Sequence, residues 1–178
     1  MKHPGDHVDR ILSDWNRERP DLNLGPMAVV GRVRRLNTFF LRGMEETWAE
    51  FDLNMASFDV LSTLLRAGPP YSLSPGDLIA STMVTSGTMT HRIDQLERAG
   101  MVRREKNRDD GRGVVIHLTD RGRGLIEQAL VAHMATQAQL VSSLSPSERD
   151  TLAELLRKML NAFEAPSSSK SSDRSHGA

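Results

Sequence analysis

The sequence predicts a mainly α-helical fold that contains one small β-hairpin. Most of the chain carries apolar residues at helical spacing, in segments that end at residues which stop helices. The period changes once, where residues 101–106 and 113–118 read as strands around a polar turn with Asp-Gly at its tip. Residues 165–178 are rich in serine and lack large apolar side chains, so we expect a disordered tail there.

Each helix is expected from its apolar stripe and from the residues that bound it. The expected helices cover residues 6–17, 26–51, 55–67, 75–82, 85–99, 119–142 and 146–163. Suitable N-cap residues lie at or just before the start of four of them: Asp6, Ser74, Thr119 and Ser145. Glu148 follows Ser145 by three residues, which is the pattern of a capping box. Gly100 is the expected C-terminal stop of the helix over 85–99.

Composition narrows the class of protein. The chain has 178 residues, 38% of them hydrophobic, with 23 basic and 23 acidic side chains, which fits one globular domain with a tail. The absence of cysteine excludes disulfide scaffolds, thiolate metal sites and cysteine nucleophiles. No apolar run approaches the roughly 20 residues that cross a bilayer, and the N-terminus does not read as a signal peptide. We therefore expect a cytoplasmic protein with no membrane partner.

The order of elements over residues 74–118 predicts a winged helix-turn-helix: a short helix, a turn, a longer helix and a hairpin. The longer helix fits the major groove of double-stranded DNA, with Ile93 and Leu96 on its buried side. Its N-terminal face carries hydroxyls and hydrogen-bond donors, and the hairpin tip carries arginines suited to a minor groove. The candidate DNA-binding residues are Thr85, Ser86, Thr88, Thr90, His91, Arg92, Arg108 and Arg112.

Other functions find less support. A winged helix that binds protein instead of DNA stays open as an alternative. No nucleophile-base-acid spacing, P-loop or dinucleotide fingerprint is present, so we expect neither an enzyme nor a cofactor. His3 and His7 have the spacing of a metal pair but lack a third ligand nearby, so we expect no metal site.

Two stretches carry a resemblance to the MarR family. Residues 78–80 with 86–104 resemble its DNA-binding core, and residues 109–119 followed by Gly122 resemble its wing. The resemblance extends over about residues 27–163 and implies a homodimeric, ligand-responsive transcriptional regulator whose N- and C-terminal helices form the dimer interface. We accordingly expect an extra helix within 1–25, and a domain over 26–164 whose DNA-binding core covers about 55–119.

A narrower resemblance concerns the urate-responsive subgroup of that family. The chain has an extra N-terminal helix with Trp15, and Asp59 and Arg66 lie seven residues apart on the third helix. The resemblance implies that these three residues and Arg92 form the ligand site. It implies a repressor that leaves a palindromic operator when it binds a small anionic metabolite such as urate or a related purine. A small carboxylate such as trans-aconitate, or a regulator without a ligand, stays open.

Helical geometry supports part of this assignment. Asp59 and Arg66 are two turns apart and share a helix face. Apolar neighbours place that face at the edge of the core, where an arginine requires an anionic partner. Trp15 offers a ring on which a flat ligand can stack. The alternative is that Asp59, Arg66 and Arg92 form an ion network that only braces the third helix against the recognition helix.

Overall fold

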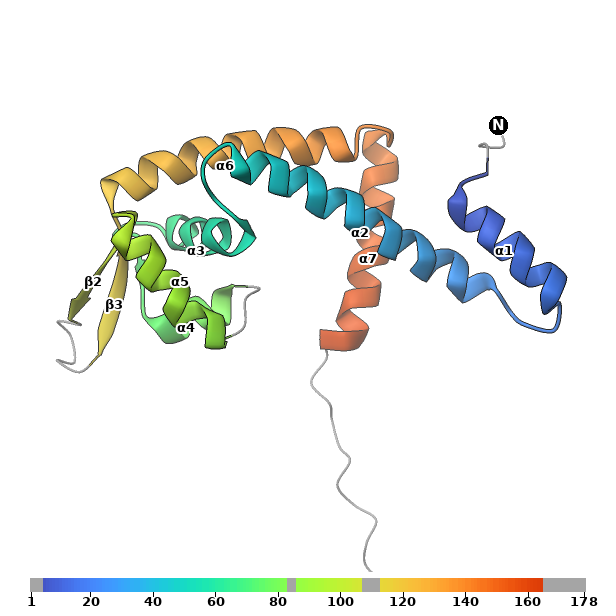
Figure 1. The fold of residues 1–178 in the computed structure, drawn as a ribbon, viewed down its shortest axis with the longest axis horizontal. Helices are drawn as coiled ribbons and strands as arrows, with labels where there is room; N and C mark the ends of the chain where they lie inside the picture. The colour runs from blue at the N-terminus through green and yellow to red at the C-terminus, as the bar shows by residue number, and fades with distance from the viewer. Residues whose placement is uncertain (1–4, 83–85, 107–112, 165–178) are drawn as a thin grey trace, which may run out of the picture. The chain divides into compact units, whose positions relative to one another are not determined.

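The computed structural model describes residues 5–82, 86–106 and 113–164 (Figure 1). The chain separates into two compact units, Met1–Leu140 and Val141–Ala178. The elements are α1 (His7–Glu18), α2 (Gly25–Ala49), α3 (Met55–Arg66), β1 (Ser72–Leu73), α4 (Pro75–Ser81), α5 (Ser86–Arg98), β2 (Val102–Lys106), β3 (Val114–Leu118), α6 (Asp120–Leu140) and α7 (Pro146–Glu164). The expected mainly helical fold with a small hairpin is confirmed. The tail expected over residues 165–178 lies outside the described residues.

The helix boundaries follow the capping residues. The backbone N–H of Asp9 donates to Asp6 Oδ1 at 2.9 Å. The backbone N–H of Asp6 in turn donates to Asp9 Oδ2 at 2.8 Å, which completes a capping box. Ser145 and Glu148 form the capping box expected at the start of α7. Asn54 caps α3 by accepting from the N–H of Ser57 at 3.0 Å, a cap that the sequence reading did not identify.

The hairpin is part of a three-stranded antiparallel sheet with strand order β1–β3–β2. The hairpin strands pair as expected, for instance Arg103 opposite His117. The edge strand β1 was not expected, and it places Ser72 opposite His117 on the other side of β3. A strand of two residues is too short to show a period in the sequence, which explains why it was missed.

The core of the first unit is built around α3, which lies between α6 and the α4–α5 pair in Figure 1. Val60, Leu61 and Leu64 of this helix are completely buried. Ile93 and Leu96 of α5 are buried as expected, so α5 has a fixed inner face. Other side chains of this core come from α4, the sheet and α6: Leu78, Val102, Ile116, Leu118, Ile126 and Ala129.

An aromatic cluster joins α2, α3 and α6. The ring of Trp48 stacks on Phe58 with a centroid separation of 5.4 Å and on His133 at 5.6 Å. Burial lowers the pKa of His133, because the charged imidazolium would lose its hydration there. Helical spacing from Ile126 and Leu130 predicts that Met134 lies on the inner face of α6. Met134 is exposed and the neighbouring His133 is buried, so that expectation was wrong by one residue.

Helix α1 is attached to α2 at its N-terminal end. Val8 is buried against Gly31, where an added Cβ would lie 3.2 Å from Val8 Cγ1. Arg32 of α2 forms ion pairs with Asp6 at 2.8 Å and Asp9 at 2.5 Å. The first turn of α1 is therefore held by both packing and charge.

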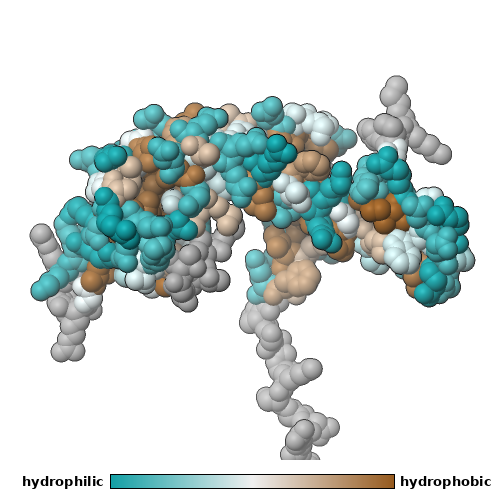
Figure 2. Space-filling view, viewed as in Figure 1, coloured by the Kyte–Doolittle hydropathy of each residue, from teal (hydrophilic) through white to brown (hydrophobic). Residues whose placement is uncertain are grey.

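Helix α7 has no buried residue, although it carries the apolar stripe expected from the sequence. Figure 2 shows the hydrophobic (brown) surface along this helix. The exposed members of the stripe are Leu152, Leu155, Leu156, Met159, Leu160 and Phe163. The N-terminal half of α2 is also apolar and exposed, at Val30, Val33 and Leu36. Among the described residues, no helix is long and apolar enough to cross a bilayer.

Candidate nucleic-acid interface and adjoining cavity

Helices α4 and α5 pack against each other and form the helix-turn-helix. Met89, Ile93 and Leu96 fix the inner face of α5, whereas Thr90 and His91 are exposed. This arrangement leaves the side of α5 that carries Thr90 and His91 exposed to solvent. Of the remaining candidates, Ser86 and Thr88 belong to α5 with their side chains outside the described set, and Thr85, Arg108 and Arg112 lie outside the described residues.

The base of the wing is tied to the recognition helix α5 by one arginine. Arg104 of β2 forms ion pairs with Asp94 and Glu97 of α5, and its backbone N–H donates to Glu97 Oε1 at 3.0 Å. The sequence reading did not identify these residues. Their signal was the pair of acidic side chains three residues apart on α5. The network therefore links strand β2 of the wing directly to α5.

The C-terminal end of α5 is joined to the start of α6 by hydrogen bonds. Thr119 Oγ1 lies 2.8 Å from the carbonyl oxygen of Gly100 and 3.0 Å from that of Met101, and it accepts from the N–H of Gly122. A Cβ at position 122 would lie 2.1 Å from the carbonyl oxygen of Met101, so this approach requires glycine. Gly100 has a φ of 71° and ends α5 as expected. This junction is therefore tightly packed.

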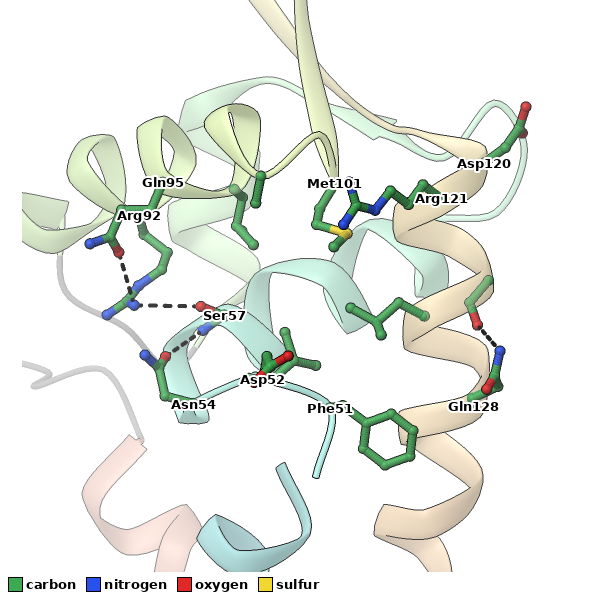
Figure 3. A pocket seen from close by; sticks show the side chains of 15 residues that line it. Phe51, Asp52, Asn54, Ser57, Arg92, Gln95, Met101, Asp120, Arg121 and Gln128 are labelled. Atoms are coloured by element: carbon green, nitrogen blue, oxygen red, sulfur yellow. Dashed lines mark hydrogen bonds between the residues drawn. The ribbon is translucent and has the colours of Figure 1, made fainter. Parts of the chain in front are cut away.

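A cavity of about 700 Å³ lies beside α5, between the α2–α3 loop and the start of α6 (Figure 3). Asn54, the N-cap of α3, and Ser57 line it, as do Arg92 and Gln95 of α5. Arg121 and other residues of α6 line its remaining side. The cavity thus touches the helix that carries the candidate DNA-binding residues.

Arg92 carries a positive charge and hydrogen-bonds to neutral groups. Its Nη1 donates to Ser57 Oγ at 3.4 Å and to Gln95 Oε1 at 3.3 Å. Its Nε is buried and has no hydrogen-bond partner among the described residues. A half-buried guanidinium of this kind favours an anion, because part of its hydration has been removed and neutral groups replace it poorly.

The four predicted ligand residues lie in three places. Trp15 is on α1, 44% exposed, and α1 packs on α2. Asp59 and Arg66 share one face of α3, and Arg66 Nη2 donates to the carbonyl oxygen of Ser81 at 2.9 Å. Only Arg92 of the four lines the cavity. The structure, over the residues it describes, therefore does not bring the four side chains together around this one cavity.

Arg66 has a structural contact of its own. Its bond to Ser81 satisfies a carbonyl at the C-terminal end of α4, and a second bond reaches Thr63 Oγ1 at 3.3 Å.

The described residues contain no group of three or more histidine or acidic side chains placed to hold a metal ion.

Comparison with known proteins identifies the family. The MarR family model matches residues 51–113. Over 152 residues the chain is 36% identical to the HTH-type transcriptional regulator PecS of Dickeya dadantii. The matched stretch covers 85% of this chain and 92% of PecS. The chain belongs to the MarR family. The resemblance read from the sequence is confirmed, and this MarR-family protein is a DNA-binding transcriptional regulator.

Solved structures agree with this assignment. A mutant of Escherichia coli MarR in complex with operator DNA has a TM-score of 0.65 and 28% identity, covering 82% of this chain and 97% of that one. Bordetella bronchiseptica BpsR, whose DNA binding is regulated by 6-hydroxynicotinic acid, has a TM-score of 0.66 and 26% identity, covering 75% and 93%. Both similarities extend well beyond the matched family domain.

Proposed function

We propose that this MarR-family protein is a repressor that binds a palindromic double-stranded DNA operator as a homodimer and leaves it on binding a small anionic metabolite. One observation carries the proposal: α5 exposes Thr90 and His91 on one side and places Arg92, hydrogen-bonded to neutral groups, in a cavity. The same helix is thus suited to contact DNA and to sense an anion. On this view the protein is not an enzyme.

The homodimer is supported by the exposed apolar surface. The stripe of α7 and the N-terminal half of α2 leave large apolar side chains in water, which soluble proteins generally cover with a partner. A two-fold dimer would present two α5 helices to DNA. Half-sites separated by about one helical turn, roughly 10 base pairs, follow from that symmetry.

For the ligand site we propose Trp15, Asp59, Arg66 and Arg92. The similarity to PecS over most of both chains supports membership of the urate-responsive subgroup, and thus urate or a related purine as ligand. The regulation of BpsR by 6-hydroxynicotinic acid favours the second candidate, a small carboxylate. Both ligands are anions, which is the chemistry that Arg66 and Arg92 require.

The competing interpretation is a bracing network without a ligand, and the bond from Arg66 to Ser81 favours it. Arg66→Ala separates the two. If Arg66 binds ligand, the variant responds poorly to urate while it still recognises the operator. If Arg66 only braces α3 against α4, the variant loses thermal stability and keeps full ligand-induced release. Electrophoretic mobility shifts with a palindromic duplex, with and without urate, give the readout.

A further inference from the structure

We propose that Arg104 is a positioning residue for DNA binding: with Asp94 and Glu97 of α5 it fixes the direction of the wing relative to the recognition helix. Wing and helix then meet a duplex in one set orientation, although none of the three side chains has to touch DNA. The inference goes beyond the proposed repressor, because it concerns how any duplex is held. It rests only on the DNA binding that membership of the MarR family establishes.

Three contacts join Arg104 to α5. Its Nη2 pairs with Asp94 and its Nη1 with Glu97, and its backbone N–H donates to the second oxygen of Glu97, Oε1, at 3.0 Å. A planar guanidinium that bridges two carboxylates of one helix is held in a defined orientation, unlike the flexible ammonium of a lysine. Both the side chain and the main chain of residue 104 are therefore fixed to α5.

The network keeps its charges without being a strong source of stability. Burial acts to lower the pKa of Arg104, but its hydrogen bonds to Asp94 and Glu97 outweigh this effect and raise that pKa. The side chain of Arg104 is 29% exposed, against 43% for Asp94 and 37% for Glu97. Because ion pairs that remain partly in water contribute little to stability, we expect the network to act mainly on orientation.

Arg104 lies where the hairpin leaves the core. It pairs with Ile116 of β3, which is completely buried, and Val102 of the same strand is buried as well. Beyond this pair, none of the described hairpin residues, 105–106 and 113–115, is buried. The hairpin extends away from the helices there (Figure 1). Within the described residues, the pair of Arg104 and Ile116 is therefore the last point at which the core and α5 can direct the wing.

The neighbouring arginine faces the other side of the sheet. Successive side chains of a strand alternate, so Arg103 and Glu105 project away from α5. These two side chains form an ion pair with each other, and His117 of β3 lies 3.4 Å from Glu105. In the part of the chain that the structure describes, Arg103 forms no ion pair with α5. The two adjacent arginines thus carry the same charge, and Arg103 is a matched control for Arg104.

The expected consequence is tighter DNA binding by a wing that is already in place. Ordering an independent wing on a duplex would cost conformational entropy at the moment of binding. A wing held by Arg104 avoids this cost, and its tip meets the duplex together with the exposed side of α5, which carries Thr90 and His91. Arg112 of the wing tip lies outside the described residues and serves here as the reporter of wing contact.

The first test measures wing orientation without DNA. The chain has no cysteine, so His91→Cys on α5 and Lys106→Cys at the end of β2 give two specific sites for spin labels. An excess of unlabelled protein leaves one labelled chain in each dimer. We expect pulsed dipolar EPR to give one narrow distance distribution, which Arg104→Gln broadens and Arg103→Gln does not. An unchanged distribution in Arg104→Gln overturns the proposal.

The second test measures coupling on DNA. Affinities for a labelled palindromic duplex are determined at several salt concentrations for Arg104→Gln, Arg112→Ala and the double variant. Independent effects multiply to within about 2-fold, whereas we expect the combined loss to fall short of the product by more than that. Arg104→Gln alone should lower the salt slope by about one unit, because the wing contact is lost with it. Effects that multiply, as expected for Arg103→Gln with Arg112→Ala, overturn the proposal.

A neutral network separates orientation from charge. Arg104→Gln alone leaves two carboxylates near DNA, where they repel phosphates. The triple variant Asp94→Asn, Glu97→Gln, Arg104→Gln removes two negative charges and one positive charge, so charge alone predicts affinity at least equal to the wild type. We expect weaker binding than the wild type and no coupling to Arg112. Recovery of wild-type affinity and coupling overturns the proposal.

A conservative variant and a stability control complete the design. Arg104→Lys keeps the charge but lacks the fork that spans both carboxylates, so its EPR distribution and its DNA affinity should lie between those of the wild type and Arg104→Gln. All variants should melt within about 4 °C of the wild type. A lysine variant as tightly oriented as the wild type contradicts the role of the fork.

The inference and the proposed function fail in different ways. A wild type that binds palindromic and random-sequence duplexes equally well contradicts the proposed operator, while the EPR distances still decide the role of Arg104. Conversely, an unchanged distance distribution in Arg104→Gln, with operator binding and its release by urate intact, refutes the positioning role alone.

Discussion

The core around the winged helix-turn-helix, residues 55–119, and helix α7 use their apolar residues in opposite ways. The first buries Leu61, Leu64 and Leu78 completely within one chain, and its polar side chains at the wing and at α6 have specific partners. Helix α7 carries an equally regular stripe and buries none of it. The difference teaches that the helix-turn-helix core packs within one chain, whereas the apolar stripe of α7 has no packing of its own and fits the proposed dimer interface.

The largest expected effect comes from removing α7. Deletion of the chain from Ser145 onward should abolish dimers and operator binding together, because in the proposed dimer both depend on the apolar stripe. Light scattering measures the mass, and mobility shifts measure operator binding. A truncated protein that stays dimeric would show that α7 is not the interface.

A matched pair of leucine substitutions sharpens the contrast. Leu64→Ala should destabilise the protein by about 2–5 kcal/mol, as expected for a fully buried leucine. Leu155 is exposed in the single chain, so Leu155→Ala should act on dimerisation instead. Urea denaturation at several protein concentrations separates them, since only the loss caused by Leu155→Ala should depend on concentration. If both variants lost the same free energy of unfolding at every protein concentration, Leu155 would act within one chain, as Leu64 does.

The third effect is a dependence of stability on pH, and it arises from His133 in the buried aromatic cluster. Burial lowers the pKa of His133, so the unfolded chain takes up a proton before the folded one does. Stability is therefore fully present above the ordinary histidine value of 6.5 and falls as the pH drops from there towards the lowered folded pKa. His133→Gln should flatten this part of the pH profile, measured by denaturant midpoints. If the pH profile of stability is the same in the variant, another titratable group causes the dependence on pH.

The smallest effect concerns the wing tip. Arg112→Ala should weaken operator binding and reduce the slope of log affinity against log salt by about one unit, because one phosphate contact is lost. Binding isotherms at several salt concentrations give the slope. If the slope does not change, Arg112 contacts neither phosphate nor groove.

The fold was largely predictable from the sequence because its signals are local. Asp6, Ser74 and Ser145 cap helices as expected, and Ile93 and Leu96 define the inner face of α5. Local signals fail where packing between elements determines which residue is buried. His133 is buried in place of Met134 because aromatic rings from α2 and α3 receive it.

The cavity was beyond the reach of sequence reading. Ser57, Arg92 and Arg121 come from three helices and have no common spacing, so only the fold brings them together. Sequence resemblance did single out Arg92, but it grouped that residue with Asp59 and Arg66 on the other face of α3. Trp15 belongs to α1, which packs on α2, and it does not line this cavity.

The central claim is that an anion releases this regulator from DNA. The most direct measurement titrates urate, and in parallel benzoate, into the complex of the wild-type protein with a palindromic operator at constant salt, followed by fluorescence anisotropy of the labelled duplex. The account predicts saturable release by at least one of these anions and none by benzamide. A complex that stays intact at saturating concentrations of both anions, as judged by melting shifts of the free protein, would contradict it.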